Sequence, residues 1–163
     1  MMLYNRVKVI VCFAALFFLG TVIALYCVHK SVSTSIRNAY ALEWAGDMVI
    51  EYMDTNHGQW PKSWDNLREP YVELCKYAVP PCSFDELQAT VRVDWNADLD
   101  ELVRTVPAAD VTSLSVVYIE GSTSHWPGAD PNQMILDYIK GTKTGRMQYW
   151  HNRRGEEKVG KKR

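Results

Sequence analysis

The chain of 163 residues has room for one domain of ordinary size, and its 47% hydrophobic content excludes general disorder. Its net charge of -1 combines two opposite parts. Residues 9–142 hold eight Lys/Arg against seventeen Asp/Glu, whereas residues 143–163 hold eight against two. The sequence therefore predicts an acidic body followed by a basic tail.

The first element expected along the chain is a membrane-spanning helix over residues 9–28. These twenty residues carry no charge, and a helix of that length crosses a hydrocarbon core of roughly 30 Å. A cleaved signal peptide has an apolar region of about 7–15 residues that ends in small residues. Here the run is longer, "HKSVSTS" follows it, and the bulky Tyr26 before Cys27 disfavours a lipoprotein site. We therefore expect an uncleaved anchor in the lipid bilayer.

Charges beside the anchor give a slight orientation signal. Arg6, Lys8 and the terminal amine precede it without any acidic residue, while Lys30 and Arg37 follow it. By the positive-inside rule this bias favours a cytoplasmic N-terminus, residues 1–8.

The cysteines add to that signal. Cys12 and Cys27 lie in the anchor, whereas Cys75 and Cys82 flank a loop with two prolines, "CKYAVPPC". A Cys75–Cys82 disulfide would form only in an oxidising compartment. Two unpaired, half-buried thiols are the alternative that the sequence leaves open. We expect the domain at residues 29–142 to be periplasmic or extracellular.

After the anchor, residues 31–57 have the pattern of an amphipathic helix. Its apolar face carries residues at four-residue intervals with small neighbours: Tyr40, Trp44, Met48, Tyr52, Ala41, Ala45 and Val49. Its opposite face, expected to be solvated, carries Glu43, Asp47, Glu51 and Asp54. Ser33 or Ser35 caps the start, or the helix continues from the anchor as one rod.

The stretch "NHGQWPKSWDNL" reads as a junction between two helices. Gly58 supplies a left-handed helix end, and Trp60-Pro61 forces an extended step. Ser63 then caps a short helix from Trp64 to Arg68, which Pro70 ends. The two tryptophans most simply seal this junction. The alternative is a contact surface formed by Trp60, Trp64 and Trp126.

The rest of the domain is expected to alternate between strands and helices. Residues 89–95 alternate as a half-buried strand, and residues 113–120 form a second, central strand. Between them a helix begins at an Asp98 cap, with Glu101 completing a capping box, and buries Leu99, Leu102, Val103 and Val106. Asp130 and Pro131 start a helix that ends at Gly141.

Residues 146–151 are expected to add a last strand, and the basic tail after residue 142 is expected to be largely disordered. The fold class expected is α+β, with an N-terminal transmembrane helix, a long amphipathic helix and a small sheet covered by short helices.

No pattern predicts catalysis, a cofactor or a metal. "DWNADLDE" places acids at alternating positions, but an EF-hand needs Gly at its sixth position and Glu at its twelfth. Leu99 and Thr105 stand there. An irregular calcium site remains open. His57, His125 and His151 are scattered, and neither a phosphate loop nor a nucleophile elbow occurs. We therefore expect no catalytic, cofactor-binding or metal-binding residues.

The basic tail offers phosphate contacts, to anionic lipids or to nucleic acid. The simpler interpretation is a solubilising terminus that folds back on the acidic body. We expect no nucleic-acid partner.

The end of the long helix resembles a known family. "VIEYMDTNHGQWPKSWDNL" is similar to the segment where the long helix of type IV pilins and type II secretion pseudopilins ends on a Gly-x-aromatic-Pro step. Gly58, Gln59, Trp60 and Pro61 match that step. The likeness covers roughly the first seventy residues and a short motif. It implies a hydrophobic helix with an amphipathic extension and a small sheet outside the membrane.

Two features of the family are missing. "NRVKVIVCFAAL" contains neither the Gly-(Phe/Met) cleavage site nor the Glu at the fifth mature position. The charge pairing that builds filaments in the family therefore has no counterpart. The layout is also similar to that of many small bitopic bacterial envelope proteins.

Three functional hypotheses follow. The leading one is a membrane-anchored, non-enzymatic, extracytoplasmic module that binds other envelope proteins. The alternative is a pseudopilin-like component of a secretion or pilus-type system. An enzyme ranks third and requires a deep pocket that gathers His125 with carboxylates.

Overall fold

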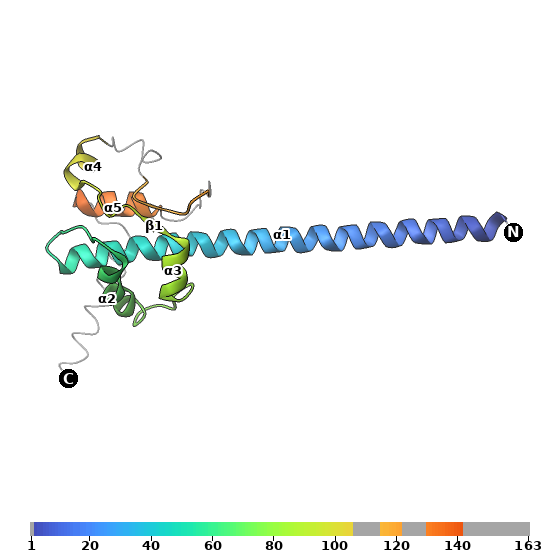
Figure 1. The fold of residues 1–163 in the computed structure, drawn as a ribbon, viewed down its shortest axis with the longest axis horizontal. Coiled ribbons are helices and arrows are strands. Elements are labelled where there is room, and N and C mark those ends of the chain that lie inside the picture. Colours follow the sequence, from blue (N-terminus) through green and yellow to red (C-terminus); the bar gives the residue numbers. More distant parts are fainter. Residues whose placement is uncertain (1, 106–114, 122–129, 142–163) are drawn as a thin grey trace. The chain divides into compact units, whose positions relative to one another are not determined.

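The structure, a computed structural model, describes residues 2–105, 115–121 and 130–141, with side chains from Leu16 onward. In chain order its elements are α1 (Met2–Thr55), α2 (Trp64–Leu74), α3 (Phe84–Thr90), β1 (Arg92–Val93), α4 (Leu99–Thr105), β2 (Val117–Tyr118) and α5 (Pro131–Ile139) (Figure 1). The prediction of a mixed α+β fold with a long apolar N-terminal helix is confirmed.

The anchor and its extension form one unbroken helix, α1. Of the two starts that the sequence left open, the continuous rod is therefore the correct one, and neither Ser33 nor Ser35 caps a new helix. Chain contacts nevertheless divide the protein between Arg37 and Asn38. We describe the two units separately.

The N-terminal unit exposes apolar side chains around the whole helix. Phe17 is 79% exposed and Phe18 71%, and Leu25, Tyr26 and Val28 are exposed to a similar degree. Within the described residues α1 is one helix long and apolar enough to cross a membrane: its most apolar window has a mean hydropathy of 1.5, and none of that window is buried. This agrees with a single-pass arrangement.

The second unit is built around the C-terminal part of α1. Figure 1 shows α2 and α3 on one side of this part and α4 and α5 on the other. Met48, Val49 and Met53 of α1 are fully buried in a core shared with all these layers, which includes Leu67, Leu87, Val117 and Leu136. Because the helix is covered on several sides, it has no solvated face over residues 41–51.

The prediction of a solvated acidic face on α1 is therefore wrong. Glu43, Asp47 and Glu51 are only 8%, 5% and 6% exposed, and each interacts with another group of the protein. Asp54 alone of the four remains exposed. Conversely Tyr40, predicted on the buried face, is 49% exposed, although its neighbours Ala39 and Ala41 are buried.

The junction after α1 has the predicted backbone. His57 and Gly58 adopt positive φ angles of 55° and 79°, and the Gly58 amide donates to the Met53 carbonyl at 2.8 Å. Ser63 occupies the N-cap position of α2, but its side chain makes no capping bond. Instead the Asn66 side chain accepts from the Lys62 amide at 2.9 Å.

Helix α2 does not stop at Pro70. It continues to Leu74, with Pro70 inside the helix and buried beside Leu67 and Leu74. Proline costs about 3 kcal/mol inside a helix. Burying three apolar residues of one face offsets that cost, since each contributes roughly 1.5–3 kcal/mol. The predicted end at Arg68 is therefore wrong.

The predicted strand over residues 89–95 is shorter than expected, because residues 89 and 90 belong to a helix and only two residues are extended in a strand. The Ser83 side chain and Glu86 form a reciprocal capping box that starts α3, and the helix runs to Thr90. Only Arg92 and Val93 remain as β1, paired antiparallel with β2 in the registers Arg92–Tyr118 and Val93–Val117.

Strand β2 is not the central strand that the sequence predicted, because the sheet in the described part of the chain has two strands. The buried side chain of Asn132 takes the place of a further strand. Its Oδ1 accepts from the amides of Val116 and Val117 at 3.0 and 2.9 Å, and its Nδ2 donates to the Val117 carbonyl at 3.1 Å. One α5 side chain thus provides hydrogen-bond partners for the backbone groups at the outer edge of β2.

The predicted cap residues of α4 and α5, Asp98 and Asp130, both accept hydrogen bonds from backbone amides, and the reciprocal Glu101 bond of the predicted capping box stays a prediction. The Asp98 carboxylate accepts from the amides of Asp100 and Glu101, and Asp130 caps α5 with Pro131 at its first turn. Val103, predicted to be buried, is 40% exposed. Helix α4 packs against the core through Leu99 and Leu102, which are partly buried. Val106, the predicted strand at 146–151 and the tail lie outside the described residues.

Candidate functional site

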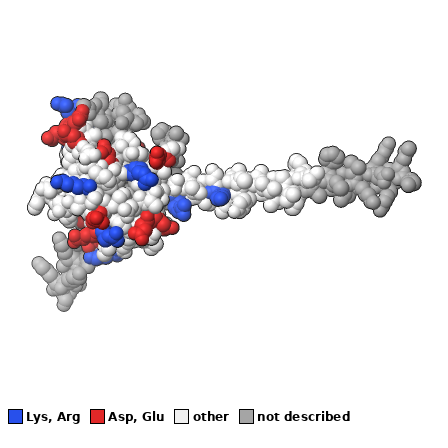
Figure 2. All heavy atoms as spheres, viewed as in Figure 1, with Lys and Arg blue, Asp and Glu red and all other residues white. Residues whose placement is uncertain are grey.

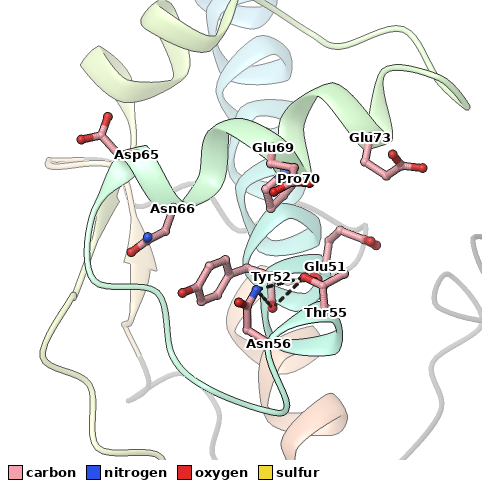
Figure 3. Close-up of a pocket in the computed structure, with 9 residues that line it drawn as sticks. All are labelled: Glu51, Tyr52, Thr55, Asn56, Asp65, Asn66, Glu69, Pro70 and Glu73. Atoms are coloured by element: carbon pink, nitrogen blue, oxygen red, sulfur yellow. Dashed lines mark hydrogen bonds between the residues drawn. The ribbon is translucent and has the colours of Figure 1, made fainter.

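A cavity of about 660 Å³ lies between the end of α1 and helix α2. Figure 3 shows that α1 contributes one wall and α2 the other. The lining is Glu51, Tyr52, Thr55, Asn56, Asp65, Asn66, Glu69, Pro70 and Glu73. We call this cavity the acidic groove, because four of the nine residues carry carboxylates and none is basic.

The regular spacing of α2 explains how the acids come together. Asp65, Glu69 and Glu73 follow one another at four-residue intervals, so they occupy one face of the helix. Together with Glu51 of α1 these three residues line the groove. Four negative side chains therefore share one opening.

The end of α1 adds to the negative potential. A helix C-terminus carries partial negative charge, and α1 has no basic residue in its last turn to offset it. Thr55 and Asn56 satisfy part of this end: the Thr55 hydroxyl donates to the Glu51 carbonyl at 2.9 Å, and the Asn56 amide donates to the Tyr52 carbonyl at 2.9 Å. These two side chains form a polar floor without positive charge.

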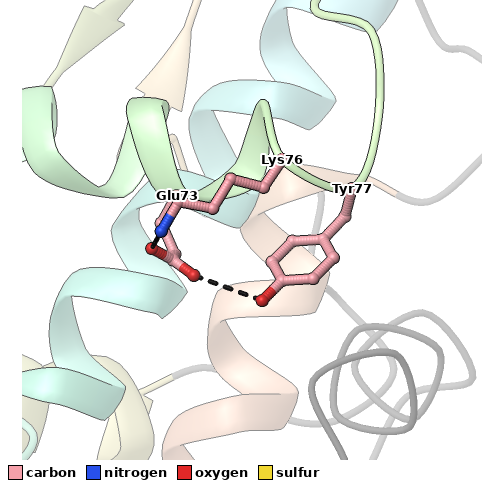
Figure 4. A network of polar contacts seen from close by, with 3 residues as sticks. All are labelled: Glu73, Lys76 and Tyr77. Atoms are coloured by element: carbon pink, nitrogen blue, oxygen red, sulfur yellow. Dashed lines mark hydrogen bonds and ion pairs between the residues drawn. The ribbon is translucent and has the colours of Figure 1, made fainter. Parts of the chain in front are cut away.

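Two of the four acids are already engaged. Glu51 is buried and interacts with another group of the protein. Glu73 forms an ion pair with Lys76 and accepts a hydrogen bond from the Tyr77 hydroxyl at 3.2 Å (Figure 4). Asp65 and Glu69 are exposed and have no ion pair within the part of the chain that the structure describes. The groove thus offers two exposed carboxylates to a cation from outside.

The groove has the chemistry of a cation-recognising surface. In Figure 2 the charged side chains visible on this face gather on the second unit, while the apolar stretch of α1 lacks them. Over residues 2–105, 115–121 and 130–141 no group of three or more His, Cys, Asp or Glu side chains could hold a metal ion.

The predicted tryptophan surface is only partly visible. The Trp60 indole donates to the Asp94 carbonyl at 2.8 Å, and Trp64 makes edge-to-face contacts with Phe84 and Trp95 at 5.8 and 5.7 Å. Both indoles are half-buried against the core, as expected for a sealed junction. Trp126 lies outside the described residues, so the three-residue surface stays a prediction.

The two cysteines of the predicted disulfide lie around Tyr71. Cys75 and Cys82 are half-buried and are present as thiols. The Tyr71 hydroxyl donates to the Cys82 carbonyl at 3.0 Å. Burial raises the pKa of Tyr71 to about 12, with smaller contributions from a hydrogen bond to Cys75 and from the charges of both cysteines.

The remaining candidates are not brought together. His57 is exposed in the turn after α1, whereas His125 and His151 lie outside the described residues. Asp94 and Asp98 accept from nearby backbone amides, Asn96 for the first and Asp100 and Glu101 for the second. Their carboxylates thus serve a turn and a helix cap.

The acidic groove was not predicted from the sequence. Glu51 was expected on a solvated face, and the helix from Trp64 was expected to end at Arg68, which leaves Glu69 and Glu73 outside it. The four-residue spacing of the acids was the available signal. It would have been recognised as one face only if the helix had been extended through Pro70.

Comparisons with known proteins return no match: no family model, no curated protein and no solved structure is similar to the chain.

Proposed function

We propose that this protein is a membrane-anchored, non-enzymatic module that binds other proteins on the extracytoplasmic side, with the acidic groove as its binding surface. The observation that carries the proposal is the groove itself. It is an open cavity with four carboxylates, no basic lining residue and an uncompensated helix C-terminus.

The anchor in this proposal is the apolar stretch of α1. Large apolar side chains from Leu16 to Val28 are 47–79% exposed, a state that costs about 25 cal/mol per Å² in water. Lipid around the helix removes that cost. This supports insertion of residues 9–28 into a bilayer.

The partner in this proposal is a protein segment rich in Lys and Arg. Exposed ion pairs contribute about 0.2–1 kcal/mol each, so several must act together in one groove. Asp65 and Glu69, which have no ion pair among the described residues, supply the first contacts. The extracytoplasmic location rests on the positive residues before the anchor and on the Cys75–Cys82 pair.

The groove is tested by charge neutralisation in the full chain held in detergent micelles. The variant Asp65→Asn/Glu69→Gln should bind a ten-residue Lys/Arg peptide about two- to tenfold more weakly at low salt. A matched control, Asp85→Asn/Glu101→Gln, removes the same charge from exposed positions outside the groove. An equal loss of peptide affinity in both variants would show that binding depends on the overall negative charge of the protein and not on the groove.

The anchor and its direction are tested in cells. Leu19→Arg/Ile23→Arg places two charges within the apolar stretch, each costing about 2.5–3.5 kcal/mol in a membrane. This variant should be released by alkaline carbonate, while Leu19→Ala/Ile23→Ala stays in the membrane. A membrane-impermeant amine reagent should label Lys62 in intact cells. Labelling only after lysis would place the domain in the cytoplasm and contradict the proposal.

The alternative function is a pseudopilin-like assembly component that associates through its anchor helix. It rests on the Gly58-Gln59-Trp60-Pro61 step of the sequence. Oxidative crosslinking between copies through Cys12 or Cys27 in the membrane would favour this alternative. Without such crosslinks the binding module is the better description.

A further inference from the structure

The loop between α2 and α3 brings two cysteines to one phenol. Tyr71 lies one helical turn before Cys75, whose amide donates to the Tyr71 carbonyl at 3.1 Å. The Tyr71 hydroxyl donates to the Cys82 carbonyl at 3.0 Å. Tyr71 therefore links the end of α2, which carries Cys75, to the backbone of Cys82.

The surroundings hold this arrangement in place. The Tyr71 ring packs edge-to-face on Phe84, with centroids 5.4 Å apart, and Phe84 is buried. Ser83 follows Cys82 directly and belongs to the capping box with Glu86. The backbone on the far side of Cys82 is thus fixed by a helix start, while Cys75 is fixed by the end of α2.

We infer that Cys75 and Cys82 are a thiol–disulfide site, oxidised by disulfides of the glutathione type, in which Tyr71 is a positioning residue. This site is chemically independent of the acidic groove and of the proposed membrane orientation, and it is tested on the purified chain.

The reaction is ordinary thiol–disulfide exchange. One thiolate of the pair attacks a sulfur of oxidised glutathione, which breaks the glutathione S–S bond and releases one glutathione thiolate. The second thiolate then attacks the protein sulfur of the mixed disulfide and releases the other glutathione. The pair loses two electrons and two protons in total, and one oxidised glutathione becomes two reduced molecules.

Tyr71 acts on the second step. Its hydrogen bond to the Cys82 carbonyl holds that backbone beside Cys75 while the mixed disulfide exists. Removing the hydroxyl frees the loop, so the ring-closing step slows and the mixed disulfide accumulates. The loss of one neutral hydrogen bond corresponds to about a fivefold change.

The first experiment incubates the full chain, in detergent micelles, with oxidised and reduced glutathione and then alkylates the free thiols. Mass analysis of the peptide with Cys75 and Cys82 should show it unalkylated and two hydrogens light. Cys12 and Cys27 serve as internal controls and should be alkylated. Glutathione adducts on Cys75 or Cys82 without ring closure would overturn the inference.

The second experiment compares Tyr71→Phe with Tyr77→Phe. Tyr77 lies inside the same loop, but its hydroxyl donates to Glu73, so it is a matched control. Ring closure should slow about fivefold in Tyr71→Phe and remain unchanged in Tyr77→Phe. Equal rates of disulfide closure in the two variants, at equal thermal stability, would show that Tyr71 does not position the cysteine pair.

Discussion

Two stretches of the same helix have opposite surroundings. The apolar residues of α1 from Leu16 to Val28 are exposed, Phe17 by 79%, whereas Asp47 and Glu51 in the C-terminal part are 5% and 6% exposed. Apolar side chains are thus exposed in the first stretch, whereas even acidic side chains are buried in the second. A helix that spans lipid has no need of protein cover, while a central helix in a small domain is covered on every side.

The comparison shows that whether a segment forms a helix and whether that helix is buried depend on different parts of the chain. Neither stretch contains Pro, and each contains a single Gly, Gly20 or Gly46, so both sequences are compatible with a continuous helix. What surrounds each stretch depends on elements much later in the chain. Four substitutions or conditions test how far the two stretches differ.

The largest effect is expected from truncating the core of the second stretch. Met48 is fully buried, so Met48→Ala should lower the free energy of unfolding by about 2–5 kcal/mol. Phe18→Ala in the exposed stretch should change it by less than about 0.5 kcal/mol. Urea unfolding of the full chain in micelles, followed by tryptophan fluorescence, measures both. Similar losses would show that the first stretch is also packed.

The next effect concerns the polar contact that closes the sheet edge. Asn132→Ala leaves two amides and one carbonyl of β2 without their partner and should cost about 1–3 kcal/mol or more. Gln133→Ala is the matched control on the same helix, since its side-chain amide donates to Asp137 and not to β2 among the described residues. Hydrogen exchange at Val116 and Val117 should rise in the first variant alone. Unchanged protection would contradict the assigned role.

A smaller effect is expected where α1 meets α5. A Cβ on Gly46 would lie 2.8 Å from the Cβ and 3.2 Å from the Cα of Pro131, so Gly46→Ala should destabilise by about 1–3 kcal/mol. Gly20→Ala meets no atom within 4 Å and should cost nothing. The same unfolding measurement separates them. An equal response would mean that α5 does not pack on Gly46.

The smallest effect is a dependence on alkaline pH. The pKa of Tyr71 is raised from 10.0 to about 12 in the folded protein, so the unfolded chain loses this proton first. The stabilisation is complete below pH 10 and is lost as the pH rises from about 10 to about 12. Tyr71→Phe should flatten that part of the stability profile, whereas Tyr77→Phe should leave it unchanged.

Much of the local structure was predictable from short sequence patterns. The Asp98 and Asp130 caps and the positive φ of Gly58 depend only on residues a few positions apart. The Ser83–Glu86 capping box is equally local and was overlooked because alternation in residues 89–95 favoured a strand. Signals of this range act before any tertiary contact forms.

The acidic groove was not predictable in the same way. Glu51 reads as a solvated residue from its neighbours in sequence, and Pro70 reads as a helix end. Both interpretations fail because residues from α1 and α2 pack together and change the balance of burial. The Asn132 side chain in the place of a strand is a further contact, 15 residues from Val117, that no local pattern contains.

The sequence by itself determined the Asp98 and Asp130 caps, the end of α1 at Gly58 and the apolar stretch of α1, because these depend on hydrogen bonds and hydropathy within a few residues. Only the tertiary structure decided which face of α1 is buried, how far α2 extends past Pro70 and which acids share the groove. Those outcomes depend on packing between elements that are distant in the chain, where the burial of a whole face outweighs the preference of a single residue.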